Sequence, residues 1–147
     1  MTDTIASIVQ SKGGVIWSVA PDSSVYDALA EMADRGIGAL LVMSENRLLG
    51  IITERDYARK IILQGRSSKE TTVEEIMTRS LVTVTPDYTI DECMRIVTEY
   101  RIRYLPVLCG SRVAGIISIG DLVNAIISDQ AHTITQLHTY IHGAAIP

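Results

Sequence analysis

The feature that most constrains the fold of this chain is an internal repeat. Residues 50–56 read G-I-I-T-E-R-D and residues 115–121 read G-I-I-S-I-G-D, so corresponding residues stand 65 positions apart. The same offset holds without a gap between residues 16–62 and residues 81–127. A repeat of this length that occurs only twice lies outside the usual solenoid periods. Two like units packed on each other explain it better than an array.

Each unit carries the pattern of a strand, a helix, two strands and a second helix. In the first unit the β-branched run 15–19 predicts a strand, and Ser24 followed by an apolar stripe predicts a helix that Gly36 ends. The apolar run 39–43 and residues 47–52 predict two strands joined by a turn, and a further helix follows. The sequence therefore predicts an α/β protein with mixed sheets, in which two units pack with pseudo-two-fold symmetry.

The segments outside the repeat are predicted to be helical or exposed. Residues 2–12 carry a short apolar stripe at helical spacing, and residues 129–142 carry a second one that is expected to pack on the body or on a second subunit. The polar stretch 64–72 is expected to be an exposed linker. The expected divisions are an N-terminal arm, the first repeat, a linker with a lead-in helix, the second repeat, and a C-terminal helix and tail: 1–14, 15–63, 64–77, 78–128 and 129–147.

Composition excludes several classes of protein. Hydrophobic residues make up 47% of the chain and charged residues 20%, which excludes disorder as the main state. No apolar run approaches the roughly 18 residues of a membrane span, so a cytoplasmic protein without membrane contact is expected. A net charge of −4 argues against broad binding to nucleic acid or to anionic membranes. The two cysteines lack metal-like spacing and are interpreted as reduced thiols.

A hydroxyl and a carboxylate three residues apart close each repeat. Thr53 with Asp56, and Ser118 with Asp121, stand where a buried strand turns into a helix, so both side chains lie on one face. Such a pair can hold the two adjacent hydroxyls of a ribose. For a lone aspartate the competing interpretation is a helix cap, and the two roles are compatible because a carboxylate has two oxygens. Its occurrence in both repeats favours ligand binding.

With these motifs the chain resembles a pair of CBS domains, the unit often called a Bateman module. The resemblance rests on V-x-P-D at the start of each repeat, I-R-Y-L-P-V at residues 102–107, and G-I-I-[TS]-x-x-D at the end of each repeat, and it covers residues 16–127. The linker and tail resemble those of stand-alone bacterial members. The resemblance implies β-α-β-β-α repeats that bind adenosine-containing ligands in the clefts between them, sense energy or stress state, and commonly form a disc-shaped homodimer.

The resemblance also implies two sets of nucleotide-binding residues. One ribose would be held by Thr53 and Asp56, and its nucleotide would be flanked from the second repeat by Thr83, Tyr104, Leu105 and Pro106. The other would be held by Ser118 and Asp121, and its nucleotide would be flanked from the first repeat by Ser18, Gly38, Ala39 and Leu41.

Two arginines are the candidates for phosphate contacts, since guanidinium forks suit phosphate oxygens. Arg103 would serve the cleft of Asp56 and Arg55 that of Asp121. A solvated side chain or a surface ion pair is the alternative for Arg103. Because Gly120 stands in the second repeat where the first has Arg55, the clefts are expected to differ in affinity or ligand.

No catalytic or metal site is predicted. His138 and His142 have the spacing of metal ligands, but no third ligand is evident, and complementarity to the helix dipole is the alternative. All three histidines lie in the last predicted helix, far from any candidate nucleophile. The prediction is a non-enzymatic homodimeric sensor of AMP, ADP, ATP or NAD that acts on an unknown protein partner. A constitutive interaction scaffold with nucleotide as a structural ligand is the alternative.

Overall fold

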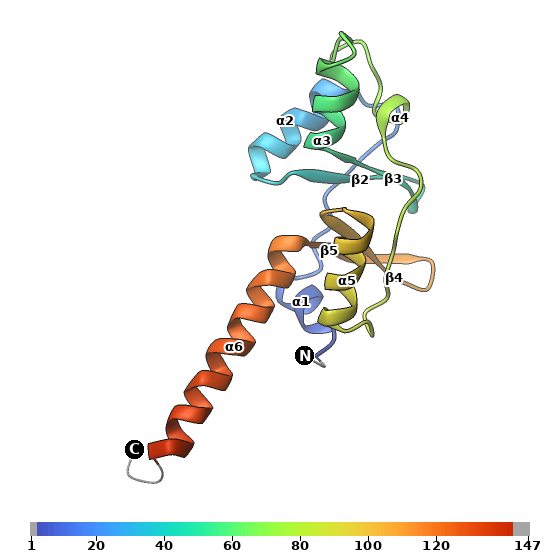
Figure 1. Ribbon diagram of the computed structural model, residues 1–147. Helices are drawn as coiled ribbons and strands as arrows, with labels where there is room; N and C mark the ends of the chain where they lie inside the picture. The colour runs from blue at the N-terminus through green and yellow to red at the C-terminus, as the bar shows by residue number, and fades with distance from the viewer. Residues whose placement is uncertain (1–2, 143–147) are drawn as a thin grey trace.

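The computed structural model describes residues 3–142, without the side chains at 131–133, 135–136 and 139–142. The chain forms two lobes, and one long helix extends away from them (Figure 1). The first repeat contains β1 (Ser18–Val19), α2 (Val25–Arg35), β2 (Ala39–Ser44), β3 (Arg47–Thr53), α3 (Glu54–Tyr57) and the π-helical turn η1 (Ala58–Ile62). The second repeat contains α5 (Ile90–Tyr100), β4 (Tyr104–Cys109), β5 (Arg112–Ser118) and α6 (Ile119–His142). Two short helices precede the repeats: α1 (Ala6–Ser11) and α4 (Val73–Ile76).

The two repeats form separate small sheets of mixed type. In the first, β1 runs parallel to β2, and β2 pairs antiparallel with β3. In the second, β4 pairs antiparallel with β5, and the strand expected before α5 is reduced to one parallel bridge between Val84 and Val107. The predicted order of strands and helices is therefore confirmed in the first repeat, and in the second apart from that short strand.

The alternation of side chains along β2 explains how the repeats are joined. Leu40 and Val42 belong to the core of the first repeat, whereas Ala39 and Leu41 point the other way, as successive residues of a strand must. The second face belongs to a third cluster, which includes Val113 from β5. The strand is therefore buried on both faces, as its continuous apolar run predicted. Its second face holds the repeats together.

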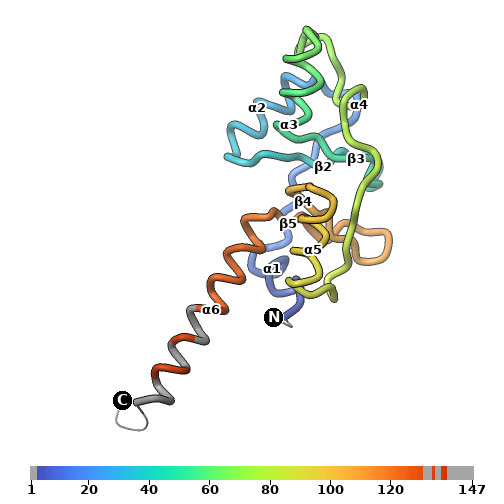
Figure 2. The backbone as a smooth tube through the Cα atoms, viewed as in Figure 1, coloured from blue at the N-terminus to red at the C-terminus, as the bar shows by residue number. Residues whose placement is uncertain are grey.

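The two short helices are exchanged between the repeats. Helix α1, which precedes the first repeat, packs on the second, and helix α4, which precedes the second repeat, packs on the first. Ile5, just before α1, and Ile8 within it are buried in the core of the second repeat, although α1 precedes the first. Val73 and Ile76 of α4 are buried in the core of the first repeat. In Figure 1, α1 lies beside α5 and α4 lies in the other lobe. Figure 2 shows the segment between α4 and α5 running along one side of the molecule from one lobe to the other.

Three predicted elements differ from those observed. The strand at 15–19 is limited to Ser18–Val19. The helix after Thr53 changes to a π turn after four residues. The separate helices expected after Ser118 and at 129–142 form one continuous helix, α6, because residues 119–142 contain no proline and no glycine beyond Gly120 to interrupt it. Among residues 3–142, none of the helices combines the length and apolar character that spanning a bilayer requires.

Candidate functional site

A cleft of about 840 Å³ lies between the repeats beside Asp56. The first repeat lines it through the end of β3, α3 and η1, and the second repeat lines it through the connection between α5 and β4. Its volume falls within the range of small-molecule sites. Six of the residues predicted from the sequence meet there: Gly38, Thr53, Arg55, Asp56, Arg103 and Tyr104.

The two oxygens of the Asp56 carboxylate have different partners. Oδ2 is hydrogen-bonded to Thr53, and Oδ1 makes two longer contacts. Its Oδ2 accepts hydrogen bonds from the Thr53 backbone N–H at 3.0 Å and the Thr53 hydroxyl at 3.1 Å, and the Asp56 N–H donates to that hydroxyl at 3.1 Å. Its Oδ1 accepts from the Thr78 hydroxyl at 3.3 Å and lies 3.2 Å from Lys60 Nζ. Capping of α3 therefore uses Oδ2, and Oδ1 can accept hydroxyl groups from a ligand.

Lys60 reaches Asp56 from the π turn η1. The Leu63 N–H donates to the Ala58 carbonyl at 3.2 Å, which gives the five-residue spacing of a π turn. The Lys60 ammonium donates to the Ile76 carbonyl at 2.8 Å, so it is fixed between α4 and the carboxylate. Sequence reasoning missed Lys60, although its i, i+4 spacing from Asp56 was a usable signal.

Basic side chains dominate this cleft even though the chain carries a net charge of −4. Arg55 donates from Nη1 to the Arg101 carbonyl at 3.3 Å, which connects α3 to the end of α5. Arg55 was expected at the cleft of Asp121, and the structure places it in the lining of the cleft of Asp56. Among the described residues, two acidic side chains line the cleft, Glu54 and Asp56, against five basic ones: Arg55, Arg59, Lys60, Arg101 and Arg103.

Tyr104 closes one side of the cleft against Gly38. An added Cβ at Gly38 would overlap the Tyr104 hydroxyl and would stand 2.8 Å from Glu54 Oε1, so only glycine fits without movement. Burial raises the pKa of Tyr104, and the nearby Glu54 carboxylate raises it further, so the hydroxyl remains a proton donor. Gly38 was expected at the cleft of Asp121, and its position in the lining of this cleft has a structural cause. It follows from the antiparallel pairing of β2 with β3, which sets Ala39 opposite Thr53 and so brings the preceding Gly38 to the end of β3.

The other predicted flanking residues do not line this cleft. The Leu105 and Pro106 side chains are buried in β4. Leu105 points to the opposite face of the strand from Tyr104, whereas Pro106 shares the face of Tyr104 but lies two residues further along the strand. Thr83 is half-buried beside the bridge at Val84. On the first repeat, Ala39 and Leu41 are buried in the cluster that joins the repeats, and Ser18 is exposed on β1 opposite Leu41.

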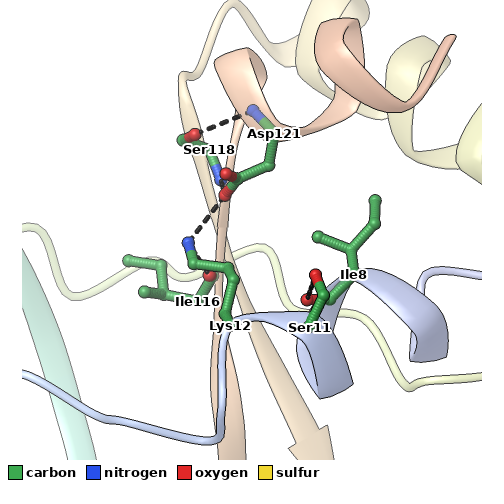
Figure 3. Close-up of polar contacts among 6 residues, drawn as sticks. All are labelled: Ile8, Ser11, Lys12, Ile116, Ser118 and Asp121. Atoms are coloured by element: carbon green, nitrogen blue, oxygen red, sulfur yellow. Dashed lines mark hydrogen bonds and ion pairs between the residues drawn. The ribbon is translucent and has the colours of Figure 1, made fainter. Parts of the chain in front are cut away.

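The second hydroxyl and carboxylate pair has a different partner (Figure 3). The Ser118 N–H donates to Asp121 Oδ2 at 2.8 Å, and the Asp121 N–H donates to the Ser118 hydroxyl at 3.0 Å. Lys12 Nζ donates to the same Oδ2 at 2.7 Å and to the Ile116 carbonyl at 3.0 Å. Burial opposes ionisation of Asp121, but the hydrogen bonds from Lys12 and Ser118 outweigh it and lower the pKa of this carboxyl.

Comparison with known proteins agrees with the fold and the doubled motif. The family model described as "CBS domain" matches residues 14–63 and again residues 73–128. This chain belongs to the CBS domain family. It is therefore a tandem CBS pair, a regulatory module with the expected α and β architecture.

Several CBS proteins are similar over most of their length. A CBS domain-containing protein of Arabidopsis thaliana named as mitochondrial is 42% identical over 95% of this chain and 72% of its own. The structure of a protein with CBS domains from Burkholderia ambifaria MC40-6 is 52% identical, with a TM-score of 0.84 over 87% of this chain and 96% of that one. The CBS pair of protein MJ0100, solved with 5′-methylthioadenosine and S-adenosyl-L-methionine, is 25% identical, with a TM-score of 0.77 over 88% and 99%.

Proposed function

We propose that the cleft of Asp56 binds an adenine nucleotide, AMP, ADP, ATP or NAD, and that the protein is a non-enzymatic cytoplasmic sensor of energy or stress state. The observation that carries this proposal is the pairing of an anchored carboxylate with a cationic rim in one cleft between the repeats. A ribose needs hydrogen-bond acceptors and a phosphate needs cations, and this cleft offers both within one volume. The adenosine ligands of the MJ0100 pair support the same ligand class.

The ribose would bind at Asp56 Oδ1. The contacts of Oδ1 with Thr78 and Lys60 are both longer than 3 Å, so a ligand hydroxyl can replace or share them. The fixed cap on Oδ2 holds the carboxylate in one orientation while this happens. The residue is only 8% exposed, which strengthens a charge-assisted hydrogen bond to the ligand.

The phosphates would bind toward the second repeat. Arg103 is exposed just before β4, and Arg101, two residues earlier, is the C-cap of α5. Both lie across the cleft from α3 and η1, which contribute the remaining cations. A bound phosphate would therefore contact both repeats and would favour their closed arrangement. A ligand shifts such an equilibrium only through differential affinity for the two arrangements.

Calorimetric titration of adenosine and AMP into wild-type protein and Asp56→Ala tests the site. We expect Asp56→Ala to lose about 1.5–3 kcal/mol of binding free energy, roughly ten- to 150-fold in affinity. Glu92→Ala is the matched control, because Glu92 completes the same capping box on α5, outside the cleft. Unchanged affinity in Asp56→Ala, together with full binding of 2′-deoxyadenosine by the wild type, would overturn the ribose assignment. A nucleotide that binds without changing assembly would favour the scaffold alternative.

We also propose that a second copy of the chain binds along α6. Among the described side chains of α6, the exposed large apolar ones fall within an arc of about 80° on the helix surface, at 100° per residue. They are Ile119, Val123, Ile127, Ile134 and Leu137, all at least 36% exposed. The two charged residues in the sequence of α6, Asp121 and Asp129, fall outside this arc. A helix that extends beyond both lobes with such a stripe is suited to a helix–helix contact (Figure 1).

The spacing of the stripe favours an antiparallel pair. Counted from Gln130, Ile126 and Ile134 are each four residues away, and Val123 and Leu137 are each seven away. Ile119 is eleven residues before Gln130, and an isoleucine also stands eleven residues after it. Apart from Ile127, whose counterpart is Thr133, and with the half-buried Ile126 included, the pattern reads the same from either end. Two antiparallel copies related by a two-fold axis at Gln130 would set apolar residues against apolar residues, as an isologous interface requires.

A further inference from the structure

We infer that a pocket beside the C-terminal end of α2 is a binding site for a small organic ammonium ion, a primary amine that carries an apolar group. The pocket has a volume of about 330 Å³, at the lower end of the range for small-molecule sites. It shares Gly38, Glu54 and Tyr104 with the cleft of Asp56, but its other lining residues belong to α2 and to the turn that follows it. The inference goes beyond the proposed function and does not rest on it.

Most of the pocket wall is apolar. Leu29, Met32 and Ala33 of α2 line it, together with Ile37 from the turn before β2. Met32 is buried, and Leu29 and Ile37 are half-buried. A nonpolar group that enters the pocket is therefore withdrawn from water, which favours its binding. The volume suits a single aromatic ring or a short branched alkyl chain better than a whole nucleotide.

A carboxylate and a phenol oxygen meet at one place on this wall. The Tyr104 hydroxyl and Glu54 Oε1 lie so close to Gly38 that an added Cβ would meet both of them. Among the side chains that the structure describes, none forms an ion pair with Glu54, and none of the residues that line the pocket is basic. An ammonium group at this position has two oxygen partners, one of them charged, so its hydrogen bonds are charge-assisted.

The end of α2 adds to the preference for a cation. This helix ends at Gly36, and its last turn contributes to the pocket lining, so the negative end of the helix dipole lies at the pocket. The basic residue of that turn, Arg35, is not part of the lining. It donates to Glu31 at 2.7 Å and lies over the ring of Trp17. The cleft of Asp56 is lined by several basic residues, so the two hollows favour ligands of opposite charge.

Titration of 2-phenylethylamine and of 2-phenylethanol, followed by the NMR signal of the Met32 methyl group, tests the inference. The two probes share an apolar ring and differ in charge at neutral pH. We expect the amine to shift the signal and to bind about fivefold more tightly than the alcohol. Glu54→Gln should lower the affinity for the amine by about threefold, since this carboxylate is exposed, and should change the affinity for the alcohol much less.

A pair of alanine variants on α2 supplies the matched control. Ala33 lines the pocket, whereas Ala30 is exposed on the same helix outside the lining. Ala33→Leu should fill the pocket and abolish binding of the amine, and Ala30→Leu should retain it. Neither alanine lines the cleft of Asp56, so titration of adenosine into the same variants reports the proposed function separately.

Three results would overturn the inference. Equal affinities for the amine and the alcohol would show an apolar pocket without preference for a cation. A Met32 signal that does not move in the wild type, or that still moves in Ala33→Leu, would show that the pocket does not bind the amine. Tighter binding of Nα-acetyl-lysine amide than of 2-phenylethylamine would assign the pocket to a lysine side chain of another protein. None of these results depends on nucleotide binding in the cleft of Asp56.

Discussion

Gly38 and Tyr104 lie in contact across the two repeats, and the tyrosine hydroxyl fills the space that a Cβ on Gly38 would need. We expect Gly38→Ala to lower the free energy of unfolding by about 1–3 kcal/mol, because the half-buried ring of Tyr104 has to move. Urea denaturation measures this change. Removing the hydroxyl in Gly38→Ala/Tyr104→Phe should restore part of the loss, since the tyrosine Cζ would be 3.6 Å from the added Cβ. Gly120→Ala is the matched control: its nearest neighbour would be 3.5 Å away, so stability should stay equal or rise.

Arg103 is predicted to contact phosphate and not the nucleoside. Arg103→Ala should weaken AMP binding by about tenfold and adenosine binding by much less, because adenosine carries no charge for the arginine to neutralise. Raising the salt concentration should reduce the difference through screening. Arg112→Ala, an exposed arginine in the β4–β5 hairpin, serves as the control and should affect neither ligand. Equal losses for AMP and adenosine in Arg103→Ala would assign the arginine to packing or an ion pair.

If two copies pair along α6, one charged residue introduced into the apolar stripe should dissociate the dimer. Leu137→Glu should convert the dimer to a monomer at micromolar concentration, because it places two carboxylates in an apolar seam. Light scattering coupled to size exclusion reports the mass. Ser128→Glu adds the same charge about half a turn away from the stripe and should leave the dimer intact. A monomeric wild type, or a dimer that tolerates Leu137→Glu, would contradict the pairing.

The Lys12–Asp121 contact predicts a pH dependence with a definite sign. The pKa of Asp121 is lowered from its ordinary value of 3.8, so its ionised form stabilises the fold above that pH, and this contribution is lost as the pH falls through the lowered pKa. Lys12→Met should raise this pKa, which carbon-detected NMR of the carboxyl measures. The stability difference between wild type and Lys12→Met should be largest near pH 7 and vanish in strong acid. A difference that persists at pH 2 would assign the effect of Lys12 to packing.

The elements that the sequence predicted best are those with local causes. Gly36 ends α2 in the left-handed conformation, and Thr89 with Glu92 forms the full capping box on α5. The continuous apolar run that buries β2 on both faces was also readable from the sequence. These features depend on residues a few positions apart, where spacing alone fixes which side chains meet.

The parts that sequence reasoning missed depend on distant segments. Lys12 and Asp121 are 109 positions apart, and no local pattern links them. Thr78 reaches Asp56 because the segment after α4 pairs with β3 at Ile51, a register that the spacing of apolar residues does not specify. The side on which Arg55 lies likewise depends on how α3 leaves β3. The doubled motif therefore predicted the residue types of the site better than the distribution of side chains between the clefts.

The crossed positions of α1 and α4 make the protein a natural candidate for fragment complementation. A chain cut in the linker near Gly65 would leave α4 on the second fragment, although its apolar residues complete the core of the first. The first fragment would keep α1, whose residues complete the core of the second. Each half thus lacks a helix that the other half carries, so the two fragments should be unfolded apart and fold on mixing. During synthesis, the first repeat should likewise complete its core only after Ile76 has left the ribosome.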